Sequence, residues 1–159
     1  MNLFGVMETS GSAMQAERMR AEVVAANMAN AETTRTESGG PYRRQMVVFA
    51  ASQDSTEFAD SLVNATGTAG AEKLDGINSG GVAPGVHIAA VVEDPAPPLK
   101  RYDPSHPDAG PDGYVAYPDI NPLTEMVDLM GATRAYGLNG SAVQAEKTMI
   151  TSALDIAKD

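Results

Sequence analysis

The stretch Val24-Ala25-Ala26-Asn27-Met28-Ala29-Asn30-Ala31-Glu32-Thr33-Thr34 contains the transition that decides the architecture of this chain. Before it, apolar residues recur every seven positions, at Met7, Met14, Ala21 and Met28. Leu3 and Val24 help to widen this apolar stripe, whose period is that of a helix rather than a strand. The period is lost within the quoted stretch. The pattern therefore predicts a helix from about Leu3 to about Met28, followed by a turn.

Proline placement limits where a second long helix can form. All ten prolines lie between Pro41 and Pro122, and proline disrupts a helix interior. A second helix is therefore predicted from about Leu123 to about Ala157, capped by Asn121 or Asp119, with Pro122 in its first turn. Its apolar residues occupy more than one side, which predicts that more than one neighbour covers it.

The centre of the chain has the features of short strands. Strands are predicted over 42–49, 86–92, 99–102 and 113–117, separated by Gly, Pro and Asp turn signals. Residues 52–84 are rich in Ser, Thr, Gly and Asn, which predicts a flexible insertion with a helical turn near 57–63.

These elements together predict an α+β fold. Long N- and C-terminal helices pair as a coiled-coil-like bundle, with a small antiparallel β-rich region and loops between them. The expected parts are residues 1–34 (helix and following turn), 35–118 (β-rich middle with the insertion at about 52–84) and 119–159 (C-terminal helix).

Composition excludes several classes of function. The chain has 159 residues, enough for one domain, and no cysteine, which excludes disulfides, thiol nucleophiles and cysteine-ligated metals. Its net charge of −10 repels phosphate backbones, so we expect no nucleic-acid partner. It has no apolar run near the roughly 20 residues of a membrane span. Its first residues do not resemble a secretory signal, so any export is expected to leave no cleaved peptide.

The strongest candidate for a metal-binding or catalytic site is the segment Asp103-Pro-Ser-His106-Pro-Asp108. These side chains include metal-ligand types, but a proline-rich turn with Asp side chains bonded to backbone amides explains the same residues. His87 is expected to be a packed or edge histidine on its strand. No nucleophile elbow, phosphate loop or dinucleotide fingerprint is present. We therefore expect no enzyme activity, no cofactor and no metal.

Apolar and basic residues also suggest contacts with other chains. Two helices of about 30 residues cannot easily cover their apolar surfaces as a pair, which favours packing in an oligomer. The basic pairs Arg43-Arg44 and Lys100-Arg101 either meet acidic neighbours in an assembly or lie on solvated strand edges.

Several short sequence motifs resemble those of a known protein family. Asn27-Met28-Ala29-Asn30 resembles the Asn-x-Ala-Asn signature of bacterial flagellar rod and hook proteins. The stretches 34–44, 102–109 and 113–121, followed by 125–139, are similar to the proximal-rod branch of that family. The signature residues are Thr34, Arg35, Gly40, Pro41, Tyr42, Tyr102, Asp103, Pro104, His106, Pro107, Gly113, Tyr114, Pro118 and Asn121.

The resemblance implies a structural, self-assembling subunit of the flagellar rod, which transmits torque and encloses the export channel. It implies export through the flagellar type III apparatus, and packing against own copies, other proximal and distal rod proteins, and the adaptor between rod and membrane ring. Expected interface residues are Leu3, Met7, Met14, Val24, Asn27, Met28, Asn30, Met126, Met130, Leu138, Met149 and Leu154.

Two alternatives remain open from the sequence. The chain could be another axial protein of the rod and hook family, or an unrelated soluble binding module with folded terminal helices. A metal-dependent enzyme using His106 and Asp108 is a more distant third reading.

Overall fold

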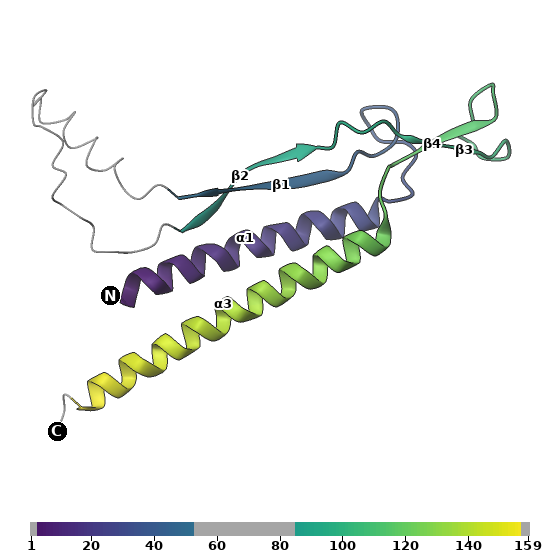
Figure 1. The fold of residues 1–159 in the computed structure, drawn as a ribbon. Coiled ribbons are helices and arrows are strands. Elements are labelled where there is room, and N and C mark those ends of the chain that lie inside the picture. The colour runs from purple at the N-terminus through teal and green to yellow at the C-terminus, as the bar shows by residue number, and fades with distance from the viewer. Residues whose placement is uncertain (1–2, 53–84, 157–159) are drawn as a thin grey trace, which may run out of the picture. The chain divides into compact units, whose positions relative to one another are not determined.

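The computed structural model describes residues 3–52 and 85–156 of the chain. Figure 1 shows two long helices, α1 and α3, and two pairs of short strands. The order of elements along the chain is α1, β1, β2, β3, β4, α3. This confirms the α+β class. Coiled-coil-like pairing of the helices stays a prediction, and the helical turn expected near 57–63 lies outside the described residues.

The two helices form where the apolar periods and the proline distribution predict them. α1 spans Leu3–Ala29 and α3 spans Pro122–Ile156. Asn121 caps α3, because its Oδ1 accepts a hydrogen bond from the Leu123 N–H at 3.0 Å. Beyond α1 the chain turns at once, with the Asn30 N–H donating to the Ala26 carbonyl and the Thr33 N–H donating to the Asn30 carbonyl, both at 3.0 Å.

The strands form two small antiparallel sheets. β1 (Gln45–Ala51) pairs with β2 (Val86–Glu93), and β3 (Leu99–Tyr102) pairs with β4 (Tyr114–Tyr117). In the second sheet the register runs from Leu99 opposite Tyr117 to Tyr102 opposite Tyr114. The prediction that the first strand begins at Tyr42 was wrong by three residues. Residues 42–44 instead precede the strand, and two of their side chains contact groups on the helices.

The chain divides into two compact units, each built from parts of several elements. Of the described residues, the first unit comprises 3–16, 50–52, 85–87 and 136–156, and the second comprises 17–49 and 88–135. In the second unit, α1 and α3 run antiparallel, since Arg20 contacts Asp128 and Asn27 contacts Glu125. Within residues 3–52 and 85–156 the core is small, and its buried apolar residues are Ala16, Val23, Val24, Val115, Ile120 and Ala132.

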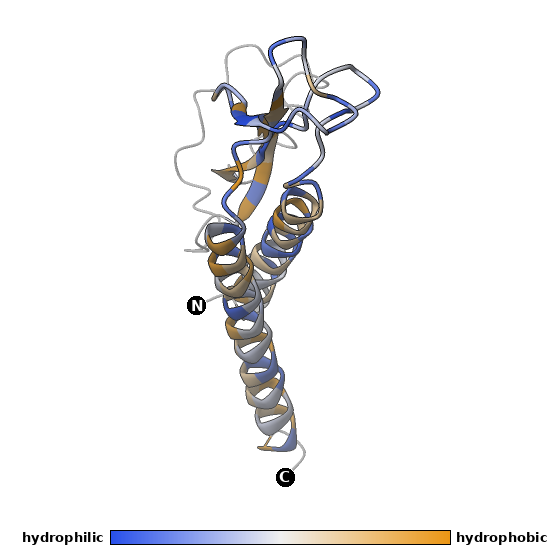
Figure 2. Cartoon of the chain, turned by 90° about the vertical axis from the view of Figure 1, so that its right-hand side faces the viewer, coloured by the Kyte–Doolittle hydropathy of each residue, from blue (hydrophilic) through white to orange (hydrophobic). Residues whose placement is uncertain are grey.

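The face of α1 that is most buried differs from the predicted heptad stripe. Met7, Met14 and Met28 are only half-buried. Burial instead centres on Ala16, Val23, Val24 and Asn27. The reason in the second unit is that α1 contacts both β1 and α3, so the side facing those elements is buried whatever the hydrophobic period. Figure 2 shows the mixed hydropathy of both helices.

Candidate assembly site

Asn27 is the centre of a buried polar cluster in the second unit, which joins α1, the segment before β1, and α3. Its side-chain Nδ2 donates to the Gln45 carbonyl at 2.8 Å and to Glu125 Oε2 at 3.1 Å. Its Oδ1 accepts from the Gln45 N–H at 2.9 Å and from the Tyr42 hydroxyl at 3.1 Å. Asn27 is only 1% exposed, so all four hydrogen-bonding positions of the amide are used inside the chain.

Glu125 continues this cluster from the first turn of α3. It is 1% exposed, and its Oε1 accepts a hydrogen bond from Arg44 Nε at 2.7 Å. Arg44 Nη2 also lies 3.8 Å from Asp128 Oδ2, and Asp128 Oδ1 accepts from Arg20 Nη2 at 3.4 Å. A buried carboxylate is tolerated only when its charge is compensated. Here an arginine and an amide provide that compensation.

Tyr42 contributes a phenol whose acidity the cluster suppresses. Burial raises the pKa of Tyr42 above its usual value, and the negative charges of Glu125 and Glu93 raise it further. The hydroxyl therefore stays protonated and donates to Asn27 Oδ1 at neutral pH. The cluster thus has a donor for each acceptor, so it holds α1, the segment before β1, and α3 in one arrangement.

The face of α3 away from this cluster is apolar and exposed. Leu123, Met126, Val127 and Met130 are 69%, 49%, 55% and 57% exposed. At about 100° per residue these four side chains fall in one arc of the helix, away from Glu125 and Ala132 on its buried side. We call these four residues the α3 ridge. Exposed apolar side chains gathered on one helix face indicate a contact surface.

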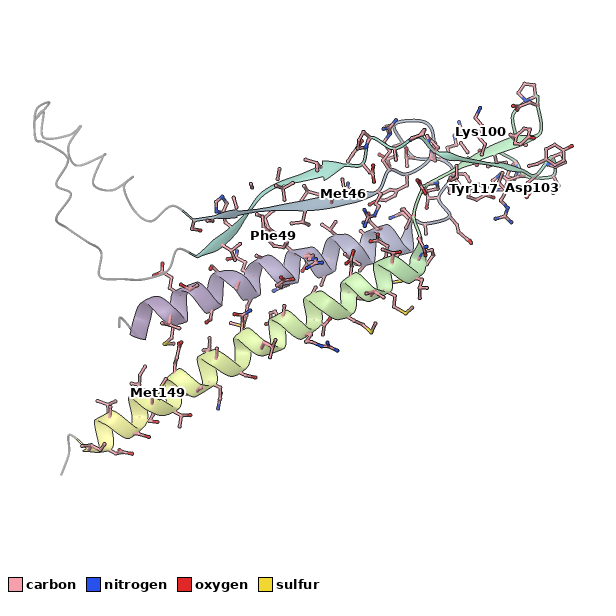
Figure 3. The ribbon with its side chains drawn as sticks, viewed as in Figure 1. Met46, Phe49, Lys100, Asp103, Tyr117 and Met149 are labelled. Atoms are coloured by element: carbon pink, nitrogen blue, oxygen red, sulfur yellow. The ribbon has the colours of Figure 1, made fainter. Side chains whose placement is uncertain are left out.

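The structure distributes the other expected interface residues unevenly. Leu138, Met149 and Leu154 are exposed on the later turns of α3, and Figure 3 labels Met149 there. Val24 and Asn27 are buried within the chain, so their side chains serve the fold of the second unit. Asn30 is half-buried and donates to the Ala26 carbonyl at 2.9 Å, beyond the end of α1. Leu3 lies in α1, but its side chain is outside the described set.

The first signature segment forms a turn that contacts the β3–β4 region. Thr34 Oγ1 donates to Asp108 Oδ2 at 2.7 Å, and Arg35 Nη1 lies 3.8 Å from Asp108 Oδ1. Gly40 has a φ of 88°, a backbone conformation that glycine adopts readily, and Pro41 follows it. Asp108 is therefore used as an internal acceptor.

The segment with His106 is the proline-rich turn that the sequence offered as the plainer interpretation. Asp103 Oδ1 accepts from the Ser105 hydroxyl at 2.7 Å and from the Ser105 N–H at 3.2 Å. The side-chain hydrogen bond from Ser105 is the main cause that lowers the pKa of Asp103. His106 Nδ1 accepts from the Asp108 N–H at 3.1 Å. Among residues 3–52 and 85–156, no three His, Asp or Glu side chains gather as a metal-binding set.

The remaining signature residues shape the β3–β4 hairpin and its exit into α3. Tyr102 and Tyr114 pack edge to face, with ring centroids 5.3 Å apart, on the exposed strands. Figure 3 shows Asp103 and Tyr117 in this region. Pro104 and Pro107 are exposed in the turn, Gly113 precedes β4 with a φ of 75°, Pro118 is buried after β4, and Asn121 caps α3.

Comparison with known proteins gives matches at both ends of the chain. A sequence model described as "Flagella basal body rod protein" matches residues 7–35, and one described as "Flagellar basal body rod FlgEFG protein C-terminal" matches residues 112–156. The flagellar basal-body rod protein FlgC of Bacillus subtilis is 38% identical over 99% of this chain and 100% of its own length. That of Borreliella burgdorferi is 35% identical over 98% of both chains. The chain belongs to the FlgC family.

Membership in the FlgC family confirms the resemblance found in the sequence and makes the chain a structural protein of the flagellar rod. The FlgC proteins of two further species, Buchnera aphidicola and Escherichia coli, are 31% and 32% identical over nearly their full lengths. Within the described parts of the chain, neither helix contains a segment long and apolar enough to cross a membrane.

Sequence reasoning missed most of the polar cluster. It singled out Asn27 and Tyr42 from the family signature, but it did not predict that Glu125 is buried or that Arg44 neutralises it. The only sequence signal was a charged residue between the apolar positions of the second helix. That signal is shared by many exposed helix residues, so it could not have identified the contact.

Proposed function

We propose that this chain is a building block of the proximal rod of the flagellum, assembled through the exposed apolar ridge of α3. The observation that carries the proposal is the contrast between the two sides of α3. One side is fixed to α1 and the segment before β1 by Asn27, Arg44 and Glu125. The other side holds four apolar side chains that are about half exposed or more. A helix face of this kind is stabilised when neighbouring subunits cover it.

The energetics favour assembly through many repeated contacts. Full burial of one Leu, Met or Val side chain contributes roughly 1.5–3 kcal/mol. The symmetry of a rod repeats the same contact at each subunit. Stiffness under torque therefore comes from the large number of equivalent contacts between subunits, and not from one strong contact. Family membership supports a place beside other rod proteins, and we extend this to the distal rod, the adaptor to the membrane ring and the wall of the export channel.

Passage through the flagellar type III apparatus requires a chain that unfolds readily. The small core of the described residues supports this part of the proposal, because few buried apolar side chains must be exposed when the chain unfolds. We propose that the chain leaves the cell by this route without a cleaved signal, and that it acts without a cofactor, a metal or any catalytic step.

The first test is mass spectrometry of detergent-purified basal bodies from the cells that make this chain. We expect the chain in these particles together with other rod proteins. Intact basal bodies that lack the chain would contradict the proposal and favour a soluble binding module.

A paired set of variants tests the role of the α3 ridge. M126E/M130E places two charges where apolar burial is expected on assembly, and we expect at least a tenfold loss of the chain from basal bodies. M126L/M130L keeps apolar side chains of similar volume and should assemble normally. Circular dichroism of each purified variant checks that α3 is intact. Equal incorporation of both variants would show that the ridge is not an assembly surface.

A further inference from the structure

An open groove in the second unit is lined by α1, β1 with the residue before it, and the first turns of α3, and has an approximate volume of 390 Å³. Val23 and Val24 of α1 form one side, and Val47 and Phe49, which share one face of β1, contribute the other. Figure 3 shows Phe49 extending from β1 on the side of α1. Phe49 remains 38% exposed, so the groove leaves a large aromatic side chain partly uncovered. An occupant that contacts Phe49 must therefore be apolar on that side. Apart from Met46, the rest of the lining is polar: Arg20, Asn27, Arg44, Gln45, Glu125 and Asp128.

The charges at the groove point to the same kind of occupant, because each of them already has a partner within the chain. Arg20 lies 3.6 Å from Glu17 and 3.4 Å from Asp128. Arg44 lies 2.7 Å from Glu125 and 3.8 Å from Asp128. A charged ligand would compete with these pairs, whereas an uncharged apolar one leaves them intact.

The α3 ridge has the matching properties. Leu123, Met126, Val127 and Met130 carry no charge, and they present flexible, exposed side chains on one face of a helix. Glu125 lines the groove, while the ridge lies on a different side of the same helix. A chain therefore cannot place its own ridge in its own groove, and the ridge must come from another molecule.

We propose that the α3 ridge of a second copy of this chain docks into the groove between α1 and β1. This rests on the proposed rod function, which brings copies of the chain together. The contact is heterologous, since two different surfaces of one chain meet. A heterologous contact leaves a free ridge at one end and a free groove at the other, so further copies can be added. It forms an open helical row, as a rod requires, when the rotation between copies does not close into a ring.

Site-specific disulfide formation tests the contact, and the absence of native cysteine makes the readout clean. Cells co-express two single variants, V47C in the groove and M126C on the ridge, and basal bodies are isolated and mildly oxidised. The pairs V47C with M130C, F49C with M126C and F49C with M130C are tested in the same way, because disulfides need Cα atoms about 4.4–6.8 Å apart.

The matched control is V48C with M126C. Val48 neighbours Val47 on β1 but points to the other face of the strand, and it is 43% exposed. It can therefore react at least as readily in random collisions. Cells that express each single variant alone complete the controls.

We expect at least one groove–ridge pair to give a dimer of twice the chain mass, more than tenfold above the V48C control, with the linkage mapped by mass spectrometry. Absence of all four linkages from basal bodies that contain the chain overturns the proposal. So does a linkage of the V47C or F49C variant to a different rod protein. Absence of the chain from the basal bodies is a distinct result, which overturns the proposed function instead.

Discussion

At the scale of single residues, Asn27 shows how a signature residue can serve the fold. An asparagine amide has two donor hydrogens and an acceptor oxygen with two lone pairs, and the chain uses all of them through Tyr42, Gln45 and Glu125. A buried amide with missing partners would be costly, whereas a fully bonded one specifies a single arrangement. Asn27 therefore sets the position of the segment that leads into β1.

Replacing Glu125 tests the energetic weight of this cluster. E125Q removes the charge that Arg44 pairs with at 2.7 Å, leaving that arginine with the more distant Asp128. Breaking a buried ion pair costs several kcal/mol, and the partial exposure of Arg44 reduces this to about 2 kcal/mol. Urea unfolding followed by circular dichroism measures the loss.

The control for E125Q is E22Q. Glu22 pairs with Arg18 at 3.0 Å, but both side chains are more than half exposed. Its loss should cost at most about 0.5 kcal/mol. Equal effects of the two substitutions would mean that Glu125 is not a structural centre.

Tyr42 predicts a specific response to alkaline pH. Its pKa is higher in the folded chain than the usual 10.0, chiefly because of burial. The folded state therefore binds the Tyr42 proton more tightly than the unfolded state does. The stability that protonated Tyr42 contributes is fully present below the unfolded pKa, and it is lost as the pH rises through the folded pKa. From about pH 9 to about pH 11, the free energy of unfolding should fall more steeply for the natural chain than for Y42F. Parallel curves would contradict this.

At the scale of elements, the β3–β4 hairpin depends on a glycine with a positive φ. Gly113 has a φ of 75°, and an added Cβ would meet Tyr102 Cε2 at 2.8 Å. The Tyr102 ring would have to move, which disturbs its edge contact with Tyr114. The hairpin thus combines backbone geometry and ring packing at one position.

A comparison of two glycine variants separates those contributions. G39A has a similar positive φ of 81° with open space around the added methyl group, so it should cost only the backbone term, roughly 1 kcal/mol. G113A should cost that amount and about 0.5–1 kcal/mol more, because it also disturbs the Tyr102–Tyr114 pair. Chemical unfolding of the two variants measures the difference, and a larger loss for G39A would contradict the argument.

At the scale of the whole molecule, burial is concentrated in a few places. Asn27 and Glu125 are each 1% exposed in the second unit, whereas every residue from 151 to 156 of α3 is exposed. Local stability follows burial and hydrogen bonding, so different parts of one helix should open with different free energies. We therefore expect the exposed end of α3 to be the least stable part of the helix in the isolated chain.

Hydrogen exchange of the purified, dilute chain tests this gradient. We expect the slowest amides of α3 near Glu125 and Ala132, and exchange at least a hundredfold faster over residues 151–156. Limited proteolysis should likewise cut the C-terminal turns first. In isolated basal bodies the same amides should become protected, because assembly covers the exposed side chains. Uniform protection of α3 in the isolated chain would contradict the prediction that its end orders on assembly.

Local signals predicted the elements well. The apolar period, the asparagine cap and the distribution of proline all act over a few residues, so the bounds of α1 and α3 could be anticipated closely. The start of β1 could not, because Tyr42 and Arg44 are drawn into contacts with distant side chains. The sequence left two interpretations of the pair Arg43-Arg44 open, namely contact with acidic neighbours in an assembly or a solvated strand edge. Arg44 follows neither of them, because it pairs with Glu125 inside the chain.

The sequence by itself determined the helical ends, the β-rich middle, the turn at His106 and the family, since each depends on short-range chemistry or on ordered motifs. Only the tertiary structure decided which polar residues are buried and which apolar residues remain outside. Asn27 and Glu125 meet across 98 positions of the chain, and no local pattern encodes such a contact. The α3 ridge likewise became recognisable only once Glu125 and Ala132 had marked the buried side of the helix, because burial is a property of what packs against a residue.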